Sequence, residues 1–114
     1  MTHYMNLKPQ PFSMIRCGAK TYELRLLDEK RKLIQVGDLI VFKNTAKPES
    51  TLSVRVKGLH VFETFEQLYA ALPLDKCGYT PDQVPYASAH DMDLYYSIEK
   101  QKQHGVIGIE IEFV

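Results

Sequence analysis

The chain has 114 residues, of which 45% are hydrophobic and 25% charged, and its 14 basic and 14 acidic side chains give a formal net charge of zero. This length supports one hydrophobic core, so we expect a single domain over residues 1–114. The neutral balance excludes a protein that attracts polyanions by its overall charge, and any contact with nucleic acid must come from a local patch. With no apolar run of the ~18 residues that span a bilayer and no signal peptide, we expect a cytoplasmic protein without membrane contact.

The first half of the chain predicts short strands that alternate with helical turns. Proline at positions 9 and 11 ends the first strand and fits the first turn of a helix, because it cannot donate to a strand ladder. Gly18 is suited to end that helix. We expect strands at 4–7, 21–26 and 39–42, a helix at 11–17, a helical turn at 28–33 and a polar loop at 43–49.

The second half contains the clearest strand of the sequence. Residues 51–61 alternate apolar and polar side chains with a period of two, which is typical of a half-buried strand. Thr64 is expected to cap a helix that ends near Pro73. We expect irregular structure at 74–89, one helix at 91–103 and a last strand at 106–113. Five strands without a regular βα alternation favour an α+β barrel over a parallel sheet.

Three charged residues, Lys20, Glu23 and Arg25, follow the Gly18 turn. In a strand, Thr21, Glu23 and Arg25 share one face, so Lys20 joins them only if it lies in the turn before the pleat begins. A desolvated lysine can act as a base or nucleophile beside a carboxylate, and arginine binds phosphate through its planar fork. From spacing alone, a functional cleft and a surface row of ion pairs have equal weight.

Tyr95, Tyr96, Ser97 and Glu99 lie on the late predicted helix. Tyr95 and Glu99 are four residues apart and are expected to share a helix face. Tyrosines can stack on a base, and Glu99 can serve as an acid or base. The alternative, in which these tyrosines pack with their hydroxyls at the rim, has more weight.

Other charged and metal-binding residue types are scattered along the chain. The run Lys30 to Lys32, with Lys43, Lys47, Arg55 and Lys57, could follow a phosphate backbone, but its acidic neighbours favour a solvated face. The four histidines and the two cysteines lack the spacing of metal ligands, so no metal or other cofactor is expected. The cysteines are expected to be reduced.

The segment from Gly18 to Arg25, followed by Ile34 to Phe42, resembles the signature of the ASCH family, a branch of the PUA-like superfamily. Residues 95–101 and 105–109 resemble the C-terminal part of small bacterial members. The resemblance implies an α+β fold, a PUA-like mixed β-barrel of about five or six strands with short peripheral helices. It also implies a cleft with Lys20, Glu23 and Arg25, in a family whose members are generally proposed to bind RNA or nucleotides. For an RNA, nucleotide or nucleoside ligand in that cleft, we expect the binding residues to be Thr21, Arg25, Tyr95, Tyr96 and Ser97.

One enzymatic branch of that family, the acetylcytidine amidohydrolases, uses a lysine, a threonine and a glutamate. Lys20 matches the lysine, but Glu23 stands where those proteins have the threonine. Glu99 is a candidate for the glutamate by proximity alone. This departure argues against that activity. It leaves open a small hydrolase acting on an acylated or modified nucleoside, with Lys20 as base or nucleophile and Glu23 or Glu99 as its proton partner.

Overall fold

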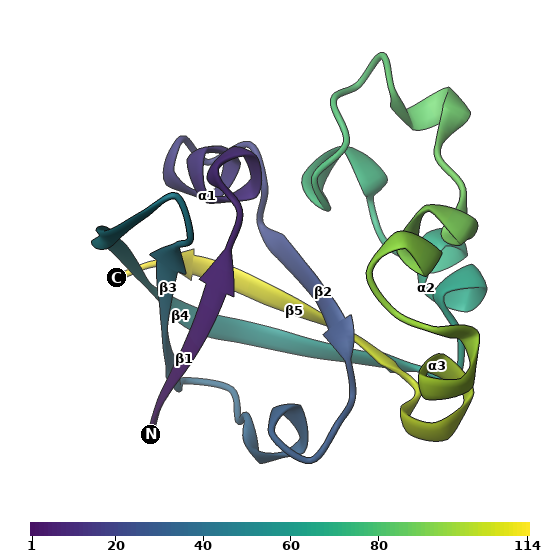
Figure 1. Cartoon of the computed structure of the whole chain (residues 1–114), viewed down its shortest axis with the longest axis horizontal. Helices are drawn as coiled ribbons and strands as arrows, with labels where there is room; N and C mark the ends of the chain where they lie inside the picture. Colours follow the sequence, from purple (N-terminus) through teal and green to yellow (C-terminus); the bar gives the residue numbers. More distant parts are fainter.

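A computed structural model describes all residues, 1–114, and its framework is one curled five-stranded sheet (Figure 1). The spatial order of the strands is β1-β3-β4-β5-β2. β1 and β3 run parallel, and the other neighbours are antiparallel. The bounds are β1 Thr2–Leu7, β2 Tyr22–Leu26, β3 Leu39–Asn44, β4 Lys47–Phe62 and β5 Val106–Phe113. The predicted α+β class and the number of strands are confirmed.

Three short α-helices surround the sheet: α1 (Pro9–Arg16), α2 (Phe65–Ala71) and α3 (Ile98–His104). Figure 1 shows α1 at one end of the sheet, and α2, α3 and the chain between them grouped together beside it. Short 3-10 helices cover 31–33, 74–76, 84–86 and 89–94. None of the helices has the length and apolar composition needed to cross a membrane.

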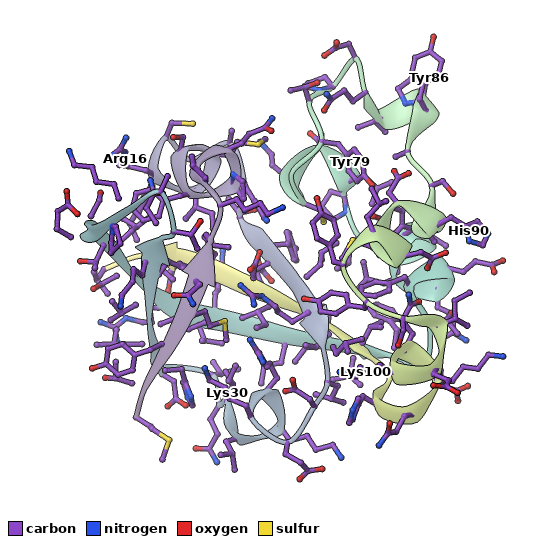
Figure 2. The ribbon with its side chains drawn as sticks, viewed as in Figure 1. Arg16, Lys30, Tyr79, Tyr86, His90 and Lys100 are labelled. Carbon is purple, nitrogen blue, oxygen red and sulfur yellow. The ribbon has the colours of Figure 1, made fainter.

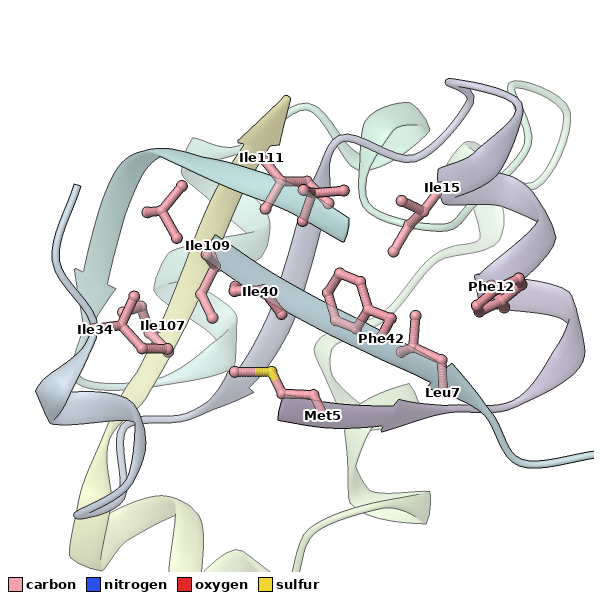
Figure 3. Packing of buried hydrophobic residues seen from close by; sticks show 12 residues of the cluster. Met5, Leu7, Phe12, Ile15, Ile34, Ile40, Phe42, Ile107, Ile109 and Ile111 are labelled. Atoms are coloured by element: carbon pink, nitrogen blue, oxygen red, sulfur yellow. The ribbon is translucent and has the colours of Figure 1, made fainter. Parts of the chain in front are cut away.

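Alternation of side chains along the strands gives the sheet two apolar faces. On the inner face, strand residues such as Phe42 and Ile109 pack against Phe12 and Ile15 of α1. Together they belong to a cluster of 12 buried residues (Figure 3). The opposite face packs against Phe65 and Leu68 of α2 in a second cluster of 7 buried residues. β2 contributes Leu24 and Leu26 to this second cluster. Glu23 and Arg25 therefore point to the inner face.

A chain of hydrogen bonds holds the segment after α2 against that helix. The Tyr69 and Tyr79 hydroxyls lie 2.7 Å apart, and Tyr79 donates to Asp91 Oδ2 at 2.7 Å. The same oxygen accepts from Ser88 N at 3.1 Å. Tyr79 lies in the part of the chain that projects beside the sheet (Figure 2). This chain of contacts positions the residues that lead into α3.

The single helix predicted at 91–103 is wrong. The structure has a 3-10 helix at Ala89–Leu94, a break, and then α3. The Ser97 hydroxyl accepts from Lys100 N at 3.2 Å, so it starts a new helix where the prediction continued the old one. Tyr95 and Glu99 therefore lie on different elements, and the predicted shared face does not exist.

The polar loop predicted at 43–49 is also wrong. β3 continues to Asn44 and β4 begins at Lys47, so the connection is a tight hairpin. Asn44 Oδ1 accepts from Ala46 N at 3.0 Å, which is the local bond that favours asparagine in turns. β4 is consequently longer than the strand predicted at 51–61. A register shift between Val56 and Gly58 marks a bulge that lets it bend along the sheet.

Asp38 links the start of β1 to the turn before β3. Its carboxylate lies 2.8 Å from His3 Nε2 and accepts from Gln35 N at 3.0 Å and from the N-terminal amine at 3.3 Å. These bonds lower the pKa of Asp38 to about 2. The bond with His3 has the largest effect, and the bond with Gln35 has the next largest. Asp38 is therefore a carboxylate whose ionised form stabilises the fold.

We predict that Asp38→Asn lowers the free energy of unfolding at neutral pH. We also predict that in this variant the free energy of unfolding falls less steeply as the pH is lowered. Because the folded pKa lies below the ordinary value of 3.8, the contribution of Asp38 is complete above that value and is lost as the pH falls toward 2. Urea unfolding across this pH range measures the effect. Asp75→Asn, at an exposed position, is the control. An acid limb of the same steepness in Asp38→Asn and the parent protein would contradict the prediction.

Candidate functional site

Lys20, Glu23 and Arg25 form a connected group of charges, here named the charge triad. Lys20 Nζ donates to Glu23 Oε1 at 2.8 Å, and Arg25 Nε donates to Glu23 Oε2 at 2.8 Å. Glu23 is only 3% exposed and Lys20 8%. The two cations therefore surround a buried carboxylate and occupy both of its oxygens.

The turn between α1 and β2 places Lys20 in the triad. Gly18 adopts a φ of 84°, which is the left-handed conformation that ends α1. Lys20 N then donates to Met14 O at 3.0 Å, and Thr21 N donates to Lys76 O at 2.9 Å. Lys20 lies before the start of β2, so its side chain is free of the strand alternation and reaches Glu23. Thr21 is half-buried at this junction.

The chain that follows α2 packs over the Lys20 side chain. Gly78 lies so close that a Cβ there would be 3.8 Å from Lys20 Nζ, and its φ of 115° favours glycine. The neighbouring Cys77 is a buried, free thiol. Burial raises the pKa of Cys77 to about 12, although the charge of Lys20 acts in the opposite direction. Cys77 is therefore a packing residue and not a thiolate.

Burial and ion pairing shift the pKa values of Glu23 and Arg25 in opposite directions. Burial alone would raise the pKa of Glu23, but Lys20 and then Arg25 outweigh it, and the pKa is lowered. Burial alone would lower the pKa of Arg25, but Glu23 raises it. Glu23 is thus a permanent carboxylate at neutral pH, which suits it to orient the two cations rather than to accept a proton.

Arg25 also spans the open side of the half-barrel. β1 and β2 are the two outer strands of the sheet, and Arg25 Nη2, from β2, donates to Asn6 O of β1 at 2.8 Å. Lys30 Nζ donates to Tyr4 O of the same strand at 2.6 Å. These two side chains satisfy carbonyl groups that an edge strand would otherwise leave exposed.

Tyr96 is the late aromatic residue on which the charges of the triad act. Burial raises the pKa of Tyr96, and the charges of Arg25 and Glu23 also act on it, in opposite directions. Its ring stacks on Phe65, with centroids 6.1 Å apart. Tyr95 is 63% exposed, and Lys8 Nζ lies 5.9 Å from the centroid of its ring.

The other predicted site residues of this region have different surroundings. The Ser97 hydroxyl is used as the cap of α3. Glu99 is exposed in the first turn of α3 and makes no hydrogen bond or ion pair with the triad. The structure therefore brings together Lys20, Glu23 and Arg25 with Tyr96 nearby, and it leaves Glu99 apart. No group of three or more histidine, cysteine or acidic side chains lies close enough to hold a metal ion.

A pocket of about 560 Å³ adjoins the triad through Arg25. Its nine lining residues include four basic side chains and no acidic one: Tyr4, Met5, Asn6, Arg25, Lys30, Arg31, Val41, Lys43 and Thr51. Sequence reasoning did not single out Tyr4, and it assigned Lys30, Arg31 and Lys43 to a solvated face. The period-two pattern of β1 places Tyr4 and Asn6 on one face, but the pairing of β1 with the distant β3 has no local sequence signal.

We predict that Glu23→Gln lowers the free energy of unfolding by about 3–5 kcal/mol, because removing one member of a buried ion network leaves its partners uncompensated. Chemical denaturation measures this. Glu99→Gln is the matched control and should change stability by no more than about 0.5 kcal/mol. Equal effects of the two substitutions would contradict a structural role for the buried carboxylate.

Comparison with known proteins gives the chain a family. The model of the ASCH domain matches residues 5–114. The hypothetical protein PH0355 is 30% identical with a TM-score of 0.82 over 100% of both chains, and PF0455 from Pyrococcus furiosus is 32% identical with a TM-score of 0.70, over 98% of this chain and 96% of that one. A mutant of ZmASCH from Zymomonas mobilis shares the fold, at 13% identity and a TM-score of 0.68, over 97% of this chain and 68% of that one. No curated protein matches the chain. The predicted PUA-like fold is confirmed, and the chain belongs to the ASCH domain family.

Proposed function

We propose that this protein binds RNA or a nucleotide at the charge triad, with Arg25 on a phosphate group. The observation that carries the proposal is the set of hydrogen bonds made by the Arg25 guanidinium. Its Nε and Nη2 both lie 2.8 Å from Glu23 Oε2, and Nη2 also donates to Asn6 O of β1, whereas Nη1 makes no hydrogen bond within the protein. A guanidinium held on two sides with donors to spare is prepared to bind an anion.

The charge balance of the site supports an anionic ligand. Two cations face one carboxylate in the triad, so the site has a positive excess on a chain whose net charge is zero. The ASCH family is generally RNA-binding. Single-stranded RNA is commonly bound by aromatic side chains that stack on bases beside basic groups, and Tyr95 and Tyr96 are the candidates here. Thr21 and Ser97 remain candidate polar contacts.

We predict that Arg25→Lys weakens binding by about tenfold or more, because a lysine keeps the charge but cannot hold Glu23 and Asn6 O while offering a third nitrogen. Fluorescence anisotropy with labelled mononucleotides and short oligoribonucleotides, at one salt concentration, measures the affinity. Arg16→Lys, an exposed arginine at the end of α1 (Figure 2), is the matched control. The same affinity for every probe in Arg25→Lys and the parent protein would refute the proposal.

A second candidate is a hydrolase of an acylated or modified nucleoside, and the burial of Lys20 beside Glu23 favours it. Lys20 is a cation in the triad, so it would serve as base or nucleophile only after losing a proton to a second group. Glu23 is committed to two cations, so Lys20 is the residue of the triad that would react, and Glu99 would need to approach from α3 to act as its proton partner.

Incubation of the protein with N-acetylated nucleosides and short RNAs, followed by chromatography of the products, tests this second candidate. We predict that Lys20→Ala abolishes any turnover and retains ligand binding if Lys20 reacts. The variant Lys76→Ala, at an exposed lysine of the neighbouring turn, should keep the activity of the parent protein. Absence of turnover in the parent protein with all of these substrates would exclude the hydrolase and leave the binding function.

A further inference from the structure

The pocket beside Arg25, here named the outer pocket, is formed by parts of the chain that lie far apart in the sequence. Tyr4 and Asn6 of β1, Val41 and Lys43 of β3 and Thr51 of β4 stand on the face of the sheet opposite the inner core. In the register of the sheet, Asn6 is the partner of Lys43, and Lys43 is the partner of Thr51. Arg25, Lys30 and Arg31 complete the pocket beyond the free edge of β1.

The basic side chains of the outer pocket exceed the carboxylates that pair with them. Arg25 is paired with Glu23 and Arg31 with Asp28. Lys30 donates to the uncharged Tyr4 carbonyl, and Lys43 makes no ion pair. Four cations thus stand against two anions, on a chain with zero net charge. This local excess creates a positive potential that attracts polyanions.

Two further observations indicate what kind of anion fits. Tyr4 is 66% exposed at the pocket, so one face of its ring is available to a planar group. Lys43 is exposed and lines the same pocket, so its ammonium group is accessible to a phosphate. An exposed aromatic ring beside unpaired lysines is the combination that binds single-stranded nucleic acid.

We propose that the outer pocket is a second binding site, which holds phosphates and one base of a single-stranded RNA whose neighbouring nucleotide occupies the charge triad. Arg25 belongs to both sites and connects them. Lys43 and Lys30 contact the phosphates, and Tyr4 stacks on the base. The inference rests on the function proposed for the triad and extends it, since the ligand becomes a strand with at least two phosphates rather than a free nucleoside.

Three substitutions at two positions test the outer pocket without disturbing the triad. Lys43→Ala should weaken binding of a labelled oligouridylate of about ten nucleotides several-fold and make the slope of log affinity against log salt shallower by about 0.7, the value for one phosphate contact on a single strand. Tyr4→Ala should weaken it by about fivefold to a hundredfold, and Tyr4→Phe should restore it, because the phenyl ring still stacks. Uridine monophosphate should bind all three variants with the affinity of the parent protein.

The matched controls are Lys100→Ala on α3 and Tyr86→Ala, at a residue that is 86% exposed in the projecting segment, away from Lys30 (Figure 2). Neither should change the affinity or the salt slope. Unchanged binding of the oligonucleotide in Lys43→Ala and Tyr4→Ala would overturn the outer pocket, and so would a loss of monophosphate affinity in Lys43→Ala. If Arg25→Lys leaves monophosphate binding unchanged while Lys43→Ala weakens the oligonucleotide, the outer pocket stands and the triad proposal fails.

Discussion

The ionised Glu23 carboxylate is the constraint on which the rest of the site depends. A buried carboxylate is costly unless strong partners offset the loss of hydration, and here Lys20 and Arg25 each take one oxygen. In return, Glu23 fixes the direction of Arg25, and Arg25 reaches the backbone of β1. One acidic residue thus couples the chemistry of the site to the closure of the sheet. The site and the opening of the half-barrel cannot be varied independently.

The opening between β1 and β2 lies at the two outer strands of the sheet. This position explains why polar residues of the site are found there. The inner core and the cluster under α2 occupy opposite faces, and neither extends across the free edges of β1 and β2. Backbone groups at those edges need partners, and long basic side chains supply them. Arg25 and Lys30 therefore have two roles that follow from one position: they satisfy the β1 carbonyls and they place positive charge at the surface.

The sequence was informative where structure depends on neighbouring residues. The strand at 106–113 and the helix ended by Gly18 could be predicted, because periodicity and turn chemistry are local. The break before Ser97 could not, since a serine in a helical pattern is equally compatible with a helix interior and with a cap. Tyr4 was missed for another reason: its surroundings come from the parallel pairing of β1 with β3, which no local pattern encodes. The triad itself could be predicted as a cluster, but its burial depends on the chain around Gly78.

The bond from Arg25 to β1 ends on the carbonyl oxygen of residue 6 and not on its side chain. Any amino acid presents that oxygen, so closure of the half-barrel demands an arginine at position 25 and places no chemical demand on position 6. The Asn6 side chain also lines the outer pocket. Position 6 is therefore a place where a single substitution can change the lining of the outer pocket while the architecture stays intact.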